Sequence, residues 1–312
     1  MKELECKPIK LQPIYKDYLW GGSKLKTFYD KTDAPEICAE SWELSVNPDG
    51  QSLTEDGRTI DDIKDFWGTN CTEEFPILVK FIDAHDNLSI QVHPSDETAL
   101  VGEHGKAEMW YVVEAEPQSY LYFGFSKEIT KQEFIEKSRD GTIRDVLNRV
   151  PVKKGDVFSI LPGTVHAIGA GIVMVEIQQN SNTTFRIFDY LRKDKDGNYR
   201  KLKLERAKDV CNLSITIPSK CRTNCSMNFP EFSMTEMFVG KYFRVYKIDV
   251  NTIAKLSTDG NSFLHFLCID GSGVIKTQEK EYQIKKGDSY FIPAQIGAFQ
   301  LSGKLRILIS RL

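Results

Sequence analysis

Short apolar runs separated by turn-forming residues dominate the 312-residue chain. The runs are rich in Val, Ile, Phe and Tyr and are bounded by Gly, Pro, Asn and Asp, a pattern typical of β-strands. Examples are FPILVKFIDA, EMWYVVEA, GDVFSILPG, GIVMVEIQQ and LRILISRL. Many short strands with turn signals favour a sandwich or a closed barrel, so we predict a mainly β protein.

Signals for helices are fewer than signals for strands. Thr130 and Glu133 match the capping-box pattern and precede an apolar stretch, which predicts a helical insertion at about 130–148. A second helix is expected near 203–212, and a short one over 61–67. The helices therefore concentrate in the N-terminal part of the chain.

One stretch of sequence occurs twice. KKGDVF at 153–158 returns as KKGDSY at 285–290, and each copy is followed by an apolar pair and a proline, Pro162 and Pro293. A coincidence between two Gly-Asp turns is the alternative, but the match continues in order from turn to strand to proline. Two related β-units explain it better than a solenoid, which needs at least three stacked repeats.

The repeat is most informative where it fails. His166 follows Pro162 by four residues, whereas Gly297 holds the same place in the second copy. We therefore expect a catalytic domain over 1–225 and a degenerate structural domain over 230–312 that lacks a metal site. The segment between them, around Pro218 to Pro230, is read as the linker.

Composition narrows the range of partners. The chain is 41% hydrophobic and 27% charged with a net charge of −3, which is ordinary for a folded protein and supplies no general attraction to nucleic acid or an anionic membrane. The N-terminus has no signal-peptide pattern, and no apolar run is long enough to span a membrane. Seven scattered cysteines predict reduced thiols and a cytoplasmic location rather than a disulfide framework.

Candidate chemistry begins in the segment LSIQVHP, which reads as a strand that ends at a proline. Because side chains alternate between faces along a strand, Gln91 and His93 share one face. A polar pair that points into a barrel indicates a bound polar group, while a strand facing water is the alternative.

Two further segments supply similar side chains. Lys106 and Glu108 share a face at the start of the next strand, and PGTVHAI delivers His166 into an apolar strand. Each segment has a structural alternative: Lys106 and Glu108 could form a solvated ion pair, and His166 could be a histidine of the core. Together, His93, Glu108 and His166 form a set that suits a divalent metal with an open position. His85 and His104 lie in polar, loop-like segments and His265 falls in the degenerate unit, so all three are expected not to be ligands.

The last candidate segment is a long polar run from Glu176 to Tyr190 that contains Arg186. Its many hydrogen-bonding groups suit a polyhydroxy ligand. Without the neighbouring candidate metal ligands, this segment would be interpreted as an ordinary surface loop.

Taken in order, these motifs resemble a known family. QVHP, GKAEMWY, PGTVHAI and QNSNTTFRIFDY, preceded by LWGG, AESWE and LVKFIDA, are similar to the short bacterial type of class I mannose-6-phosphate isomerase. The resemblance covers nearly the whole chain and implies two cupin (jelly-roll) β-barrels. It also implies interconversion of mannose 6-phosphate and fructose 6-phosphate.

The resemblance assigns roles to individual residues. It implies that His93, Glu108 and His166 bind one Zn²⁺ per chain, with Gln91 as a fourth ligand or a close neighbour. It also implies that Arg186 is catalytic and that Lys80 and Lys106 line the substrate pocket. Longer members of the family carry an extra helical domain for which this chain has no room.

The reaction needs a general base that takes a proton from C2 of the open-chain sugar and supports its transfer to C1. Three candidates for this base stay open: a metal-bound hydroxide, Glu43 or a pocket lysine. Glu43 is also expected, with Lys80 and Lys106, to bind the substrate. The phosphate requires cationic donors such as these lysines. The sequence is compatible with a monomer or a homodimer.

Three other functions fit the same residues. An Fe(II) oxygenase also uses two histidines and a carboxylate, and oxygen uptake would reveal it. A sugar-phosphate-binding module would bind mannose 6-phosphate without converting it. A third alternative is an isomerase whose substrate is another sugar phosphate.

Overall fold

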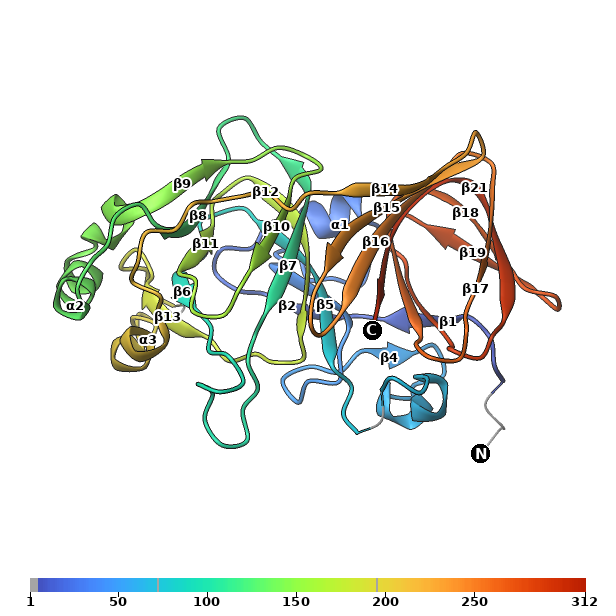
Figure 1. The fold of residues 1–312 in the computed structure, drawn as a ribbon, viewed down its shortest axis with the longest axis horizontal. Coiled ribbons are helices and arrows are strands. Elements are labelled where there is room, and N and C mark those ends of the chain that lie inside the picture. Colours follow the sequence, from blue (N-terminus) through green and yellow to red (C-terminus); the bar gives the residue numbers. More distant parts are fainter. Residues whose placement is uncertain (1–4, 72, 195) are drawn as a thin grey trace.

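The computed structural model describes residues 5–71, 73–194 and 196–312, apart from the side chains of residues 225 and 226. Strands far outnumber helices in this part of the chain, so the prediction of a mainly β protein is confirmed. The strands form three sheets, of ten, six and five strands (Figure 1). None of the described helices is long and apolar enough to cross a membrane.

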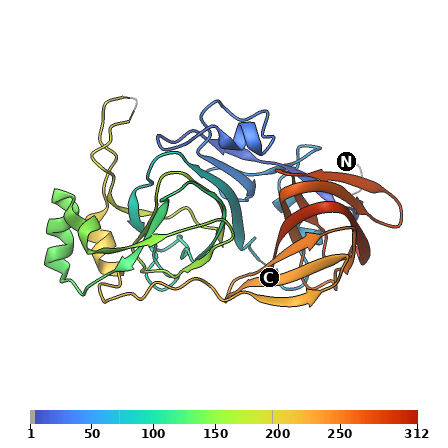
Figure 2. The same ribbon diagram turned by 90° about the horizontal axis from the view of Figure 1, so that it is seen from above.

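The six-stranded and five-stranded sheets together form what we call the N-terminal unit (Figure 2). The six-stranded sheet has the order β10 (Val157–Ile160), β7 (Glu108–Ala115), β12 (Ile172–Gln179), β5 (Ile77–Ala84), β3 (Glu40–Leu44) and β2 (Ile14–Lys16). The five-stranded sheet has the order β13 (Phe185–Phe188), β6 (Ile90–Val92), β11 (His166–Ile168), β8 (Tyr120–Phe125) and β9 (Leu147–Pro151). All of these pairings are antiparallel.

The ten-stranded sheet forms the C-terminal unit. Its main path is β14 (Asn224–Asn228), β15 (Phe232–Val239), β16 (Arg244–Val250), β21 (Ala298–Arg311), β18 (Leu264–Lys276), β20 (Ser289–Ile292), β1 (Ile9–Gln12) and β4 (Leu53–Thr54). Off this path, β17 (Ile253–Ser257) pairs with β21, and β19 (Glu281–Lys285) pairs with β18.

Hydrogen bonding between strands does not follow the predicted domain boundary. Strands β1 and β4 lie within the predicted 1–225 domain, yet they extend the sheet of the C-terminal unit. Strand β14 occupies part of the segment read as a linker and pairs with β15. The boundaries and the number of barrels stay predictions, because sheet pairing alone does not define either.

The helices lie close to where the sequence placed them. The predicted insertion contains α2 (Lys131–Asp140) and a 3₁₀ helix, η2 (Thr142–Val146), and the capping box of Thr130 and Glu133 is present. Gly141 separates them with a φ of 81°, a left-handed conformation that favours glycine. The other helices are α1 (Lys24–Phe28), which the sequence analysis missed, η1 (Asp61–Phe66) and α3 (Leu204–Val210).

One hydrophobic core joins the two units. Phe75 of the N-terminal half stacks on Phe263 with ring centroids 4.9 Å apart, and Phe263 in turn stacks on Phe291 at 5.1 Å. Val79 and Tyr111 belong to the same buried cluster. Because burying one such side chain contributes roughly 1.5–3 kcal/mol, this shared core holds the units together.

The repeated turn has the same geometry in both units. Gly155 and Gly287 have φ values of 90° and 91°. Each following aspartate accepts a hydrogen bond from the backbone of the first lysine of its copy, at 2.8 Å from Lys153 to Asp156 and at 3.0 Å in the second copy. The strands after the turns also pair alike, Phe158 with Trp110 and Tyr290 with Phe266. These matched details support a duplication.

The two glycines offer a matched test of how closely the units pack. In Gly155→Ala the new Cβ meets no atom within 4 Å. The free energy of unfolding should therefore fall only by the roughly 1–2 kcal/mol that an alanine in the left-handed conformation costs. Gly287→Ala would place its Cβ 1.9 Å from the carbonyl oxygen of Tyr29 and should lose about 1–3 kcal/mol more. Urea unfolding of both variants measures the difference, and equal losses would contradict the close contact.

Candidate metal centre and adjoining pocket

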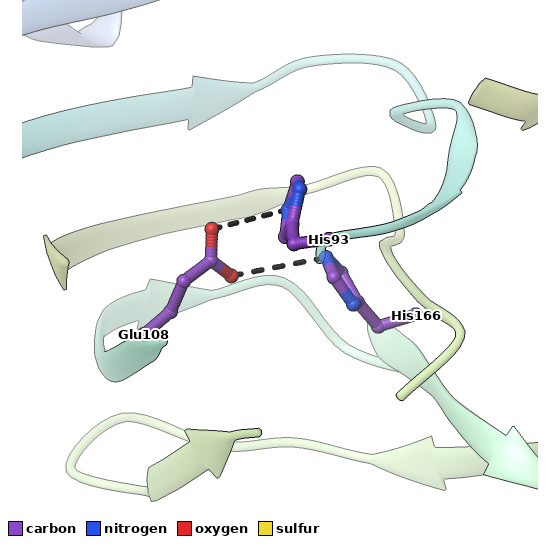
Figure 3. A group of neighbouring side chains, drawn as sticks. All are labelled: His93, Glu108 and His166. Atoms are coloured by element: carbon purple, nitrogen blue, oxygen red, sulfur yellow. Dashed lines mark ion pairs between the residues drawn. The ribbon is translucent and has the colours of Figure 1, made fainter. Parts of the chain in front are cut away.

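Three predicted ligands meet between the two sheets of the N-terminal unit. His93 follows β6, Glu108 begins β7, and His166 begins β11. Glu108 Oε1 lies 3.3 Å from His93 Nε2, and Glu108 Oε2 lies 3.7 Å from His166 Nε2 (Figure 3). The three side chains are at most 1% exposed, and their ligand atoms all lie within 4.8 Å of one another.

Backbone carbonyls orient both imidazoles. His93 Nδ1 lies 2.9 Å from the carbonyl oxygen of Thr183, and His166 Nδ1 lies 2.9 Å from that of Thr164. A carbonyl oxygen only accepts a hydrogen bond, so each Nδ1 carries the proton. Each Nε2 is then left with a lone pair that faces Glu108, the arrangement seen for metal-binding histidines.

The group satisfies the chemical requirements of a divalent metal site. Glu108 Oε2 and His166 Nε2 are buried atoms without a hydrogen-bond partner among the described residues. Burial, with a smaller contribution from Lys106, lowers the pKa of His93 to about 4. Burial would raise the pKa of Glu108, but Lys106 and the two imidazoles hold it well below its ordinary value. Neutral imidazoles and an ionised carboxylate are the forms that bind metals.

Lys106 connects this group to a pocket. Its ammonium forms an ion pair with Glu108 and lies 3.4 Å from His93 Nε2. On its other side it lies 3.7 Å from Glu176. Because Lys106 and Glu176 line a cavity of about 280 Å³, the three candidate ligands lie directly behind the wall of that cavity.

Strand register aligns two more polar side chains with the group. Gln91 on β6 is directly opposite His166 on β11 and Arg186 on β13. Residues opposite each other on antiparallel strands point to the same face, so this row crosses three adjacent strands. Gln91 and Arg186 line the cavity. Arg186 donates to Ser89 Oγ at 3.4 Å and to the carbonyl of Lys201 at 3.1 Å.

A second row of charges crosses the six-stranded sheet. Lys80 on β5 is opposite Glu176 on β12, and their charged atoms are 3.4 Å apart. Glu40 on β3 lies 3.6 Å from the same ammonium. Burial alone would lower the pKa of Lys80, but these two carboxylates raise it above its ordinary value. Trp110 Nε1 donates to the remaining oxygen of Glu176 at 2.9 Å.

Positive charge is less balanced around β13 and the segment that follows it. Arg186, Arg200 and Lys203 line the cavity from there, and Arg200 is held by a bidentate contact with Asp189 at 2.6 Å. Burial, followed by the charge of Arg200, lowers the pKa of Arg186. Neither Arg186 nor Lys203 forms an ion pair with a carboxylate that the structure describes, so this part of the lining carries excess positive charge.

The cavity contains most, but not all, of the residues predicted for it. Glu43 does not line it, because this side chain is fully buried on the opposite face of β3 and forms an ion pair with Lys31 at 2.7 Å. The sequence analysis did not single out Glu40, and it named Glu176 only as the first residue of the polar run. A signal for Glu176 was present, since it is a single carboxylate within the apolar run IVMVEI.

Removing one candidate ligand tests the group as a metal site. We expect His166→Ala to lower the affinity for a divalent metal more than about 100-fold. Replacing a residue that only hydrogen-bonds to a metal ligand typically lowers this affinity by roughly 10- to 100-fold. Elemental analysis after gel filtration measures bound metal. Exposed His85 provides the control, and His85→Ala should bind as much metal as the unchanged protein. Equal metal in both variants would exclude His166 as a ligand.

Known proteins match this chain along its whole length. Residues 9–121 match the family model of the type I phosphomannose isomerase catalytic domain, and residues 233–312 match the mannose-6-phosphate isomerase cupin domain. Mannose-6-phosphate isomerase ManA of Bacillus subtilis is 34% identical over 99% of this chain and 100% of its own. Mannose-6-phosphate isomerase of Streptococcus mutans is 32% identical, covering 98% of both chains.

Structural comparison agrees with the sequence comparison. The crystal structure of the mannose 6-phosphate isomerase from Bacillus subtilis superimposes with a TM-score of 0.91 at 30% identity, over 98% of this chain and 99% of that one. The resemblance identified from short motifs is therefore confirmed, and so is the cupin assignment. With this similarity across both of its units, the chain belongs to the type I mannose-6-phosphate isomerase family.

Proposed function

We propose that the protein is a zinc-dependent isomerase that interconverts mannose 6-phosphate and fructose 6-phosphate. The observation that carries this proposal is the buried group of His93, Glu108 and His166 behind a cavity lined by Gln91 and Arg186. Two imidazoles and one carboxylate suit zinc, and three protein ligands are typical of a catalytic site with an open position. Gln91 is the candidate for a fourth ligand.

The chemistry requires stabilisation of negative charge on the sugar. When the proton leaves C2, charge develops on O1 and O2 of an enediolate-like state. A divalent metal held by the three ligands would supply Lewis-acid stabilisation to these oxygens. Arg186 would add fixed N–H donors from the adjoining strand, oriented by Ser89 and the carbonyl of Lys201.

Glu176 is our candidate for the group that moves the proton. Its carboxylate lines the cavity next to Lys106, which itself contacts Glu108, so it lies near the candidate metal group. The indole of Trp110 holds one oxygen and leaves the other facing Lys80 and Lys106. A carboxylate held in this way is suited to accept a proton from C2 and return it to C1.

The sugar phosphate would lie at the opposite end of the cavity. Lys203 carries charge there that no described carboxylate neutralises, and Arg200 adds a guanidinium oriented by Asp189. A phosphate dianion is a suitable partner for such a cluster. Lys80 and Lys106, by contrast, are already paired with carboxylates, so we place them at the reacting end of the sugar.

Two further expectations remain proposals. A cytoplasmic location fits the thiol content, since the six cysteines with described side chains are all free. A monomer and a homodimer are both compatible with the chain as described.

A coupled assay with mannose 6-phosphate tests the function. The purified protein should convert it to fructose 6-phosphate, lose activity on chelation and regain it with Zn²⁺. Arg186→Ala should retain bound metal and fold but lose roughly 10²–10³-fold in kcat, the loss typical of one such donor. Arg139, exposed on α2, provides the control, and Arg139→Ala should keep full activity. Wild-type turnover in Arg186→Ala would remove this residue from the mechanism.

Replacing the candidate base while keeping its shape tests proton transfer. Glu176→Gln should lower kcat by roughly 10²–10⁴-fold with little change in substrate affinity, because the amide still accepts from Trp110 but no longer takes a proton. The incorporation of deuterium from D₂O into the sugar should fall in parallel. Glu40→Gln is the informative comparison. If it abolishes exchange while Glu176→Gln retains it, the base is Glu40.

A further inference from the structure

The connection between β6 and β7 carries the candidate site at both of its ends. It begins at His93 and ends at Lys106 and Glu108, while residues 100–104 between them are exposed. Two contacts tie its ends together. Lys106 N donates to the carbonyl of Pro94 at 3.0 Å, and Gly105 N donates to Asp96 Oδ1 at 2.9 Å. The position of Asp96 therefore affects where Lys106 enters the cavity.

Asp96 is also linked to the strand that carries Glu176. Gln179 Nε2 donates to Asp96 Oδ1 at 3.1 Å, and Gln179 Oε1 accepts from Ala107 N at 2.9 Å. The fit around Asp96 is tight, because a Cβ at Gly105 would lie 2.6 Å from the backbone nitrogen of Asp96. A small shift of this carboxylate would thus be passed to Lys106 and Glu108.

The other oxygen of Asp96 is bound by the C-terminal unit. The hydroxyl of Tyr242, in the turn between β15 and β16, donates to Asp96 Oδ2 at 2.5 Å. The next residue, Phe243, is buried in the core that joins the two units and packs on Phe238 with ring centroids 5.2 Å apart. The turn that carries Tyr242 is therefore fixed, and its hydroxyl provides a rigid point for the loop.

We propose that Tyr242 is a positioning residue through which the C-terminal unit holds the ligand-bearing loop. It fixes Asp96, which in turn holds Gly105 and Gln179 so that Lys106 and Glu108 keep their places. The role in catalysis rests on the proposed function, whereas the role in holding the loop does not. Losing one hydrogen bond of this kind changes an equilibrium constant roughly 3- to 10-fold. Removing the Tyr242 hydroxyl should therefore change the opening of the loop by a modest but measurable amount.

The test compares two tyrosines of the C-terminal unit, each of which donates one hydroxyl hydrogen bond; the Tyr242 hydroxyl also accepts one from Lys241 at 3.2 Å. Tyr242→Phe removes the contact with Asp96. Tyr290→Phe removes a contact with the carbonyl of Gln283, 2.7 Å away and within the unit itself. In the metal-free protein, Tyr242→Phe should raise amide hydrogen exchange at Gly105 and Ala107 roughly 3- to 10-fold. Tyr290→Phe should leave exchange at these amides unchanged.

Two further readouts separate positioning from general destabilisation. Zinc release to a competing chelator should be roughly 3- to 10-fold faster in Tyr242→Phe, with the thermal midpoint close to that of the unchanged protein. In the isomerase assay kcat should fall and KM should stay the same. Asp96→Ala combined with Tyr242→Phe should be no worse than Asp96→Ala alone, because Tyr242 acts through the Asp96 side chain.

The outcomes that overturn the inference are distinct. Three results would each remove Tyr242 from this role. Amide hydrogen exchange at residues 105 and 107 could stay the same in Tyr242→Phe, or it could rise equally in Tyr290→Phe. The losses of the two single variants could also add in the double variant. If the unchanged protein does not isomerise mannose 6-phosphate but Tyr242→Phe still loosens residues 105 and 107, the proposed function fails while the positioning role stands.

Discussion

A carboxylate removed from water needs counter-charges, and this requirement organises the N-terminal unit. Glu108 is 1% exposed, and the ammonium of Lys106 is its counter-charge, while the neutral imidazoles of His93 and His166 turn their lone pairs toward the same space. Leaving such a charge without a partner would cost several kcal/mol. The ammonium and the two imidazoles come from segments that adjoin strands of two different sheets. The sheets must therefore pack in one register for the buried charge to be tolerated, and the same register brings the candidate metal ligands together.

The cavity beside this group is divided by charge. Where Lys80 and Lys106 face Glu40, Glu176 and Glu108, both cations are paired and the carboxylates outnumber them by one. Elsewhere on the lining, Arg186 and Lys203 lack such partners among the described residues. This gradient suits a ligand with a neutral polyhydroxy part and one anionic end, since each part meets the environment that its charge requires.

The C-terminal unit has the repeated turn but not the histidine. Gly287 repeats the geometry of Gly155, yet Gly297 stands where the first copy has His166. The unit is nevertheless tied to the first one by strand β1, by Ser289 Oγ, which donates to the carbonyl of Glu43 at 3.0 Å, and by the shared aromatic core. Lys31 also donates to the carbonyl of Gly287 at 2.6 Å, so the turn itself contributes to the junction.

Periodicity in the sequence was sufficient to predict strands, to place Gln91 and His93 on one face and to recognise His166 as exceptional within the repeat. Strand alternation and residue type also brought Glu108 into the candidate metal set, and the family motifs added a catalytic role for Arg186. Alternation along β3 places Glu40 and Glu43 on opposite faces, but only the packing of the sheets decides which face meets the cavity. The same holds for Glu176 beside Lys80 and for Tyr242 beside Asp96. Such contacts join residues far apart in the chain, and their partners depend on strand order and sheet packing, which local pattern does not encode.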